Sequence, residues 1–343
     1  VFSEAVAAFT NADFTIVNGA LSTVADSGDA TTWTATYTPT AETYDATNVL
    51  TIGTGYTDTA GNAGAGGTSA NYIVDGVDPT MTITSATVSS GTTTNDATIA
   101  LTFTSSESTT DFIVGDITVS GGSLSSFAGS GATYTATFTP TTDGATSISV
   151  TADKFADSAG NQNEVSNTFA WTYDSTALTI TIASSTSGVT SGSTTNDGSI
   201  ALTFSTSEST TGFESGDVTV SGGTLSSFAG SGDAYTATFT PTTDGATSIS
   251  VAAGTFTDGA GNANTVSNTF AWTYDGTGPT VAITSTASDP ASSSTIAVTI
   301  TFSESTSNFV NGDLTLSGAT STLSGSGTTY TATLTPSADG TVT

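Results

Sequence analysis

The chain has 343 residues and carries 30 Asp and Glu against a single basic residue, for a formal net charge of −29. Such a surface repels nucleic acid and anionic membranes, so we expect neither as a partner. The absence of Cys and His excludes disulfides and thiol chemistry and removes the commonest general base. No apolar run is long enough to cross a bilayer, so membrane insertion is not expected either.

One pattern recurs along the chain roughly every 100 residues, which is the size of a β-sandwich domain. The segment YTATFTP at 134–140 returns at 235–241, with variants at 33–39 and 330–336. A loop of the form D-x-A-G-N begins at Asp58, Asp157 and Asp258. We therefore divide the chain into four repeats. The segments 75–173 and 174–274 are complete, whereas 1–74 lacks its beginning and 275–343 lacks its end.

Alternation of apolar and polar residues predicts seven strands in the first complete repeat, separated by Gly, Ser, Asn and Asp clusters. In chain order these strands cover 80–86, 97–104, 115–120, 123–128, 133–139, 146–152 and 167–173. In the fifth strand Tyr134, Ala136 and Phe138 share one face, and threonines occupy the other. Trp171 has the same period-2 placement in the last strand, which favours core packing over sugar stacking. The expected fold is all-β: tandem immunoglobulin-like Greek-key sandwiches in an elongated array.

The order of these motifs resembles that of bacterial Ig-like repeats of giant extracellular adhesins and other surface proteins. The resemblance rests on the F-x-E segment after the second strand, the D-[IVL]-T-[VL] strand, Y-T-A-T-F and D-x-A-G-N, and it covers nearly the whole chain. It implies an extracellular or cell-surface stalk, adhesion or matrix role, and it identifies no receptor.

Acidic loop residues are expected to converge at one end of each repeat. If the seven strands run alternately up and down, the loops after the second and sixth strands share the end at which the repeat begins. Clustered carboxylate and amide oxygens without basic neighbours are ligands that suit Ca²⁺. The expected calcium ligands are Asp75, Asp78, Glu107, Asp157 and Asn161; Asp174, Glu208, Asp258 and Asn262; Asp275 and Glu304; and Glu4, Asp58 and Asn62.

A structural interpretation of the same acids stays open, because Asp and Asn are ordinary turn residues. The Asp-Gly turns at Asp143, Asp244 and Asp339 lie at the opposite end of each repeat, so Asp143 is expected to approach the linker at Asp174. A metal ligand and a simple β-turn both explain these aspartates. Asp116 and its counterparts cap a turn as readily as they bind metal.

The predicted function is that of a structural spacer with calcium at the domain junctions, and we expect no enzyme and no catalytic residues. Its expected partners are the neighbouring repeats of the same chain, other copies in a filament or sheath, and a glycan or cell-surface receptor reached through regions outside this sequence. The alternative is an adhesive module in which the repeats themselves bind a glycan or protein. Strand exchange between the incomplete terminal repeats is a third hypothesis. Ice binding by Thr rows is disfavoured because immunoglobulin-like sheets twist.

Overall fold

The computed structural model describes residues 1–289, 291 and 293–343, and it is almost entirely β. The helices of these residues are short 3-10 turns: η1 (Asn11–Asp13), η2 (Val114–Asp116), η3 (Ser215–Asp217) and η4 (Asn311–Asp313). None of the helices described is long and apolar enough to cross a membrane. The chain forms two compact units. Unit 1 comprises Val1–Leu178, Glu208–Gly212 and Gly254–Thr265, and unit 2 comprises Thr179–Ser207, Phe213–Ala253 and Val266–Thr343.

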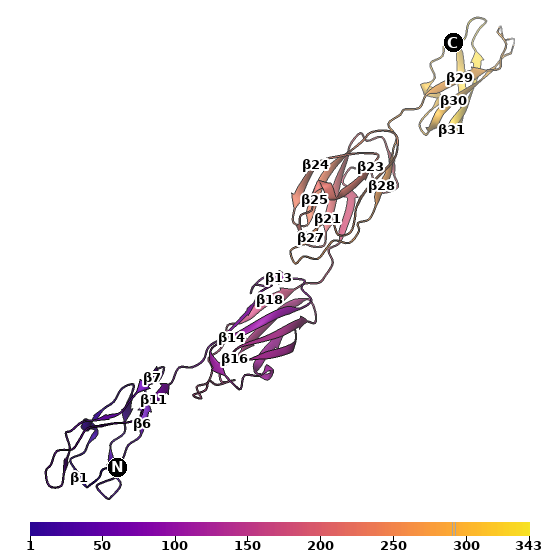
Figure 1. Cartoon of the computed structure of the whole chain (residues 1–343). Helices are drawn as coiled ribbons and strands as arrows, with labels where there is room; N and C mark the ends of the chain where they lie inside the picture. Colours follow the sequence, from indigo (N-terminus) through magenta and orange to yellow (C-terminus); the bar gives the residue numbers. More distant parts are fainter. Residues whose placement is uncertain (290, 292) are drawn as a thin grey trace. The chain divides into compact units, whose positions relative to one another are not determined.

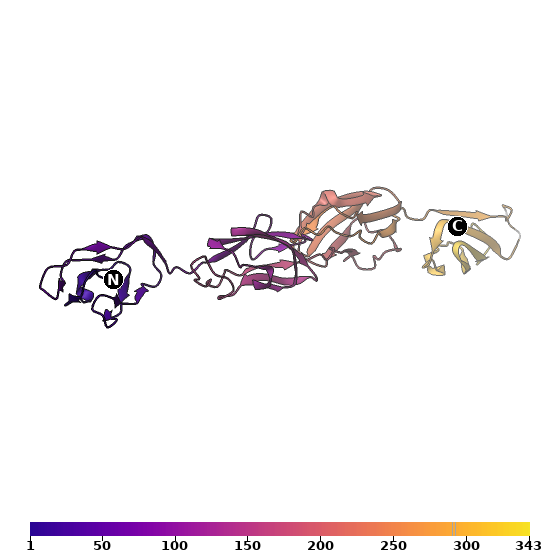
Figure 2. The same ribbon diagram turned by 60° about the horizontal axis from the view of Figure 1, so that its bottom comes forward.

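Residues 75–173 of unit 1 form a sandwich of two open sheets, which Figure 2 shows as two layers. One sheet has the order β12-β14-β16, with all pairs antiparallel. The other has the order β13-β18-β17-β15, in which only the β13–β18 pair is parallel. The strands, several of which Figure 1 labels, are β12 (Met81–Ser85), β13 (Thr93–Thr94), β14 (Ile99–Thr109), β15 (Ile117–Ser120), β16 (Gly122–Pro140), β17 (Gly144–Val150) and β18 (Phe169–Tyr173).

These strands agree with the predicted ones except in three places. The second strand continues to Thr109, so Glu107 lies within β14 instead of after it. The two strands predicted at 123–128 and 133–139 form one continuous element, β16. The short strand β13 was not predicted, because two threonines give too little alternation to reveal a strand.

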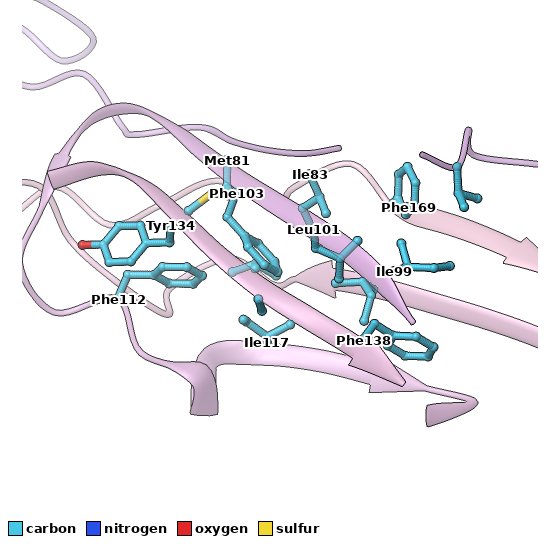
Figure 3. Close-up of a cluster of buried hydrophobic side chains, with 14 of the residues drawn as sticks. Met81, Ile83, Ile99, Leu101, Phe103, Phe112, Ile117, Tyr134, Phe138 and Phe169 are labelled. Carbon is cyan, nitrogen blue, oxygen red and sulfur yellow. The ribbon is translucent and has the colours of Figure 1, made fainter. Parts of the chain in front are cut away.

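The core of this repeat lies between the two sheets and is rich in aromatic rings (Figure 3). Phe103 and Phe138 are fully buried, as is Phe155 from the loop after β17. The rings of Phe138 and Trp171 meet edge to face, with 4.7 Å between their centroids. Trp171 is therefore a core residue, as its period-2 position predicts. The alternation of apolar and polar residues predicts this core because every second residue of each strand faces the layer between the sheets.

Residues 1–74 of unit 1 form smaller sheets around a separate cluster of Val6, Phe9, Val24 and Tyr56. Four two-stranded sheets pair β1 with β9, β3 with β6, β4 with β5 and β7 with β11, and a fifth sheet has the order β10-β8-β2. The strands are β1 (Val6–Ala7), β2 (Phe14–Thr15), β3 (Gly19–Leu21), β4 (Ala25–Asp26), β5 (Trp33–Thr34), β6 (Tyr37–Pro39), β7 (Tyr44–Asn48), β8 (Thr51–Ile52), β9 (Thr57–Asp58), β10 (Gly67–Thr68) and β11 (Tyr72–Asp75). The pair β22 (Thr210–Thr211) and β27 (Thr257–Asp258) also belongs to unit 1.

Unit 2 contains two sheets with the same arrangement, β19-β21-β25-β24 and β20-β28-β26-β23. Their strands are β19 (Ile180–Ser184), β20 (Thr194–Thr195), β21 (Ile200–Thr206), β23 (Val218–Ser221), β24 (Gly223–Ser231), β25 (Ala234–Pro241), β26 (Gly245–Val251) and β28 (Phe270–Tyr274). A further sheet, β29-β30-β31, consists of β29 (Val281–Ser285), β30 (Ile296–Thr306) and β31 (Ala319–Pro336). Ile300, Tyr330 and Ala332 form its buried cluster.

Candidate metal centre

The D-x-A-G-N loop folds around the side chain of its own aspartate. The Asp157 Oδ1 atom accepts hydrogen bonds from the backbone amides of Ala159 (2.8 Å), Gly160 (2.7 Å) and Asn161 (3.0 Å). Gly160 has a φ of +98°, a conformation that glycine adopts without strain. The loop therefore fixes Asp157 rigidly next to β14, where an isolated bridge joins it to Thr109.

Three carboxylates meet at this loop. Asp75 ends β11, Glu107 lies in the outer half of β14, and Asp157 follows β17. One carboxylate oxygen of each lies within 4.8 Å of the other two. Asp157 is only 9% exposed, and the other two are half-buried. Three segments far apart in the sequence thus bring three anionic oxygens to one point.

The electrostatics of this trio disfavour three negative charges. Burial, followed by the charges of Asp75 and Asp157, raises the pKa of Glu107 above its usual value. Asp157 behaves in the opposite way. Burial alone would raise its pKa, but the hydrogen bonds from Asn161, Gly160 and Ala159 together outweigh burial and lower the pKa. The anionic form of Asp157 is therefore stabilised, whereas burial and two negative neighbours destabilise the anionic form of Glu107.

A second trio repeats this arrangement within unit 1. One oxygen each from Asp174, Glu208 and Asp258 lies within 4.8 Å of the others. Asp258 is 3% exposed, and its Oδ1 accepts the amides of its loop at 2.8 to 2.9 Å. Burial raises the pKa of Glu208, with further contributions from the charges of Asp174, Asp258 and Asp143. The two trios therefore match in residue type and burial, and in both of them burial and neighbouring charges raise the pKa of the glutamate.

The asparagine of each loop contacts the linker through its amide nitrogen. Asn161 Nδ2 donates to Asp157 Oδ2 at 2.8 Å and to the backbone oxygen of Asp75 at 3.1 Å. Asn262 Nδ2 makes the same two bonds, to Asp258 Oδ2 at 3.0 Å and to the Asp174 oxygen at 2.9 Å. In this geometry the amide nitrogen faces the carboxylate, so the asparagine orients the trio and the linker.

The remaining predicted ligands lie outside these trios. Asp78 is not among the three carboxylates that meet at Asp157. In the described part of the chain, Asp275 and Glu304 belong to no group of three acids. Glu4, Asp58 and Asn62 line a hollow of about 250 Å³, and Asp58 accepts the Asn62 amide nitrogen at 2.7 Å as in the other loops.

Asp116, which precedes β15, and its counterparts in the other repeats each cap a 3-10 turn. Asp116 Oδ2 accepts the backbone amide of Ile113 at 2.8 Å, and Asp217 and Asp313 accept the equivalent amides at 2.9 Å. Asp13 makes the same bond to the amide of Thr10. Of the two interpretations that the sequence left open for these residues, the capping one describes their geometry.

Sequence reasoning missed two buried asparagines, Asn163 and Asn264, that support the loops. Asn163 is 2% exposed. Its Oδ1 accepts the backbone amides of Lys154 and Phe155, and its Nδ2 donates to the backbone oxygens of Thr151 and Glu164. The signal available in the sequence was the N-x-N spacing, which recurs at 161–163 and 262–264.

The fold and the recurring site define a class of protein, the tandem immunoglobulin-like repeats. The profile of a bacterial Ig-like domain matches residues 1–74, 75–173, 174–274 and 275–343, and the chain belongs to this family.

Solved structures add two similar chains. The crystal structure of invasin, described as a bacterial integrin-binding protein, is 16% identical with a TM-score of 0.38 over 96% of this chain and 67% of that one. The C-terminal domain of the AgI/II polypeptide BspA from Streptococcus agalactiae is 10% identical with a TM-score of 0.29 over 57% of this chain and 99% of that one. No curated protein matches the sequence.

Proposed function

We propose that this chain is a structural repeat region of a long extracellular surface protein, such as a stalk, an adhesin spacer, a filament or a sheath, in which calcium stiffens the linkers. Membership of the bacterial Ig-like family supports the structural role. The observation that carries the calcium proposal is the recurrence of the carboxylate trio. Asp75–Glu107–Asp157 and Asp174–Glu208–Asp258 have the same residue types and burial in successive repeats.

The chemistry of the trio fits a hard divalent cation. All three donors are carboxylate oxygens, and Ca²⁺ accepts about six to eight oxygens from carboxylates, carbonyls and water. Mg²⁺ requires stricter octahedral geometry and gives up its water reluctantly, so it fits three protein carboxylates less well. Burial and the charges of Asp75 and Asp157 raise the pKa of Glu107, and a cation would replace the repulsion between these charges with attraction.

A cation would stiffen the linker because the three carboxylates come from two parts of the chain, the linker and the repeat that follows it. Asp174 directly follows β18, at the start of the linker, whereas Glu208 and Asp258 belong to the repeat that begins there. A cation shared among them would fix the linker to that repeat. Without a cation, three like charges within 4.8 Å favour separation of the linker from the loop.

A non-catalytic role fits the same residues. The sequence has no His or Cys to serve as a base or nucleophile. The acids of the trios recur in successive repeats, which is typical of a structural role and not of a single active site. Association of copies into a filament or sheath is part of the proposal.

Calcium titration of the full chain tests this function. Calcium that binds only the folded state at a free concentration of about 100 times its Kd stabilises it by about 2.7 kcal/mol per site. We expect the melting temperature to rise in calcium, to rise less in magnesium and to return in chelator. Glu107→Gln and Glu208→Gln should each remove one site in calorimetric titration.

Matched controls use glutamates of the same repeats that lie outside the trios. Glu164→Gln and Glu214→Gln make the same change in charge and should leave the calcium stoichiometry intact. Equal melting temperatures in calcium, magnesium and chelator would refute the calcium proposal and leave an acidic spacer held by packing alone.

A further inference from the structure

The turn between β16 and β17 holds the linker that follows β18. Asp143 Oδ1 accepts the backbone amide of Ser175 at 2.9 Å and the Ser175 hydroxyl at 2.7 Å. Asp143 Oδ2 accepts the Thr176 hydroxyl at 2.6 Å. Both carboxylate oxygens are therefore bound to linker residues 32 and 33 positions further along the chain.

The next repeat makes the same connection within unit 2. Asp244 Oδ1 accepts the backbone amide of Gly276 at 2.7 Å, and its Oδ2 accepts the Thr277 hydroxyl. The backbone amide and the threonine hydroxyl are donors in both linkers, whereas the Ser175 hydroxyl has no counterpart in Gly276. The contact thus survives a change in one linker residue, because the backbone amide supplies the first hydrogen bond in both.

The turn itself does not require these bonds. Asp339 occupies the same Pro-x-x-Asp-Gly type of turn, and in the described residues no hydrogen bond to its side chain is found. In contrast, the hydrogen bonds from Thr176 and Ser175 lower the pKa of Asp143, and those from Thr277 and Gly276 lower the pKa of Asp244. Both carboxylates are thus stabilised as anions by linker donors.

We propose that Asp143 and Asp244 are latches that fasten each linker to the repeat before it and restrict its motion independently of any bound metal. Each latch uses two carboxylate oxygens and donors from two successive linker residues, so the linker backbone loses freedom at both positions. This inference goes beyond the proposed function, because the latch consists of hydrogen bonds to the linker and requires no cation.

The rest of the first of these linkers is held from the following repeat. Asn262 Nδ2 donates to the Asp174 oxygen at 2.9 Å. Leu178 is 0% exposed, and its backbone oxygen accepts the amide of Thr265 at 2.7 Å. Between Asp174 and Leu178, Asp143 accepts the hydrogen bonds of Ser175 and Thr176. Loss of the latch should therefore free the middle of the linker while both of its ends stay attached.

The test compares amide hydrogen exchange at the two linkers of the full chain, in chelator, for Asp143→Ala and Asp244→Ala. Removing a charged hydrogen-bond acceptor should accelerate exchange of its donor amide by about tenfold or more. Asp143→Ala should accelerate Ser175 and leave Gly276 unchanged, and Asp244→Ala should do the reverse. Asp339→Ala, in the same type of turn, should change neither amide.

Thr176→Val and Thr277→Val provide a second pair of variants that keep both aspartates. Each should accelerate exchange in its own linker only, which decides the matter if an aspartate variant loses its cooperative melting. The latch is refuted if Ser175 exchanges equally fast with and without Asp143. It is also refuted if either variant accelerates both linkers alike, or if the difference appears only when calcium is present.

Discussion

The side-chain amide nitrogen of Asn262 lies 2.9 Å from the backbone oxygen of Asp174, although 88 residues separate the two. The same nitrogen lies 3.0 Å from Asp258 Oδ2. One amide therefore joins the start of the linker to the buried aspartate of the loop. Asn161 makes the same two contacts with Asp75 and Asp157, so this connection recurs in successive repeats.

We expect Asn262→Ala to destabilise its repeat by about 1–3 kcal/mol, because Asp258 is buried and would lose a hydrogen-bond donor. Trp272 in the same repeat provides the measurement, by denaturant unfolding followed by fluorescence after Trp33 and Trp171 are changed to Phe. Asn161→Ala in the same background is the control and should leave the Trp272 transition in place. An unchanged midpoint for Asn262→Ala would show that the amide contributes little.

A substitution in the core should lower stability more than a substitution in the loops. Phe103 is 0% exposed and packs between the two sheets of its repeat. Phe103→Ala should destabilise residues 75–173 by about 3–5 kcal/mol, since a large buried ring leaves a cavity. Ile113→Ala, at a side chain that is 59% exposed, should change stability by less than about 0.5 kcal/mol. Trp171 fluorescence reports both, and a similar loss in both variants would contradict the assigned core.

Much of the fold could be predicted from the sequence because each strand has one buried and one exposed face. Tyr134, Ala136 and Phe138 are buried as their alternation predicts. The continuation of β14 to Thr109 could not be predicted in this way. Residues 104–108 are Thr, Ser, Ser, Glu and Ser, which carry no apolar alternation, and the register of β14 against β16 shifts between Thr104 and Thr109.

The candidate site was predictable in outline and not in detail. The alternation of strand directions indicates which loops share an end of the repeat, and this reasoning groups Asp75, Glu107 and Asp157. It also places Asp143 near the linker at Asp174, but it does not reveal that Asp143 accepts hydrogen bonds from Ser175, nor that the side-chain nitrogen of Asn161 donates to the backbone oxygen of Asp75. Both depend on side-chain placement across more than 30 residues of chain, which no local pattern encodes.

Asn163 offers a test of a residue that sequence reasoning missed. Its side chain makes four hydrogen bonds to backbone groups around the loop, and it is 2% exposed. Asn163→Ala should cost about 3 kcal/mol or more, because several buried backbone groups lose their partners together. Thermal unfolding monitored by Trp171 measures this loss. The exposed neighbour Gln162→Ala should be nearly neutral, and equal effects of the two variants would contradict the role of Asn163.

Acid titration tests a separate loop in the first repeat. The backbone amides of Thr32 and Thr31 hydrogen-bond to Asp29 and lower its pKa from 3.8 to about 2. Because the folded-state pKa lies below the ordinary value, the stabilisation is complete above pH 3.8 and is lost as the pH falls through about 2. NMR titration of the Asp29 carboxyl carbon should give this low midpoint, with the Thr31 and Thr32 amide shifts following it. In Asp29→Asn these amide shifts should no longer titrate, and a midpoint near 3.8 in the unmodified chain would show that the two hydrogen bonds do not persist in solution.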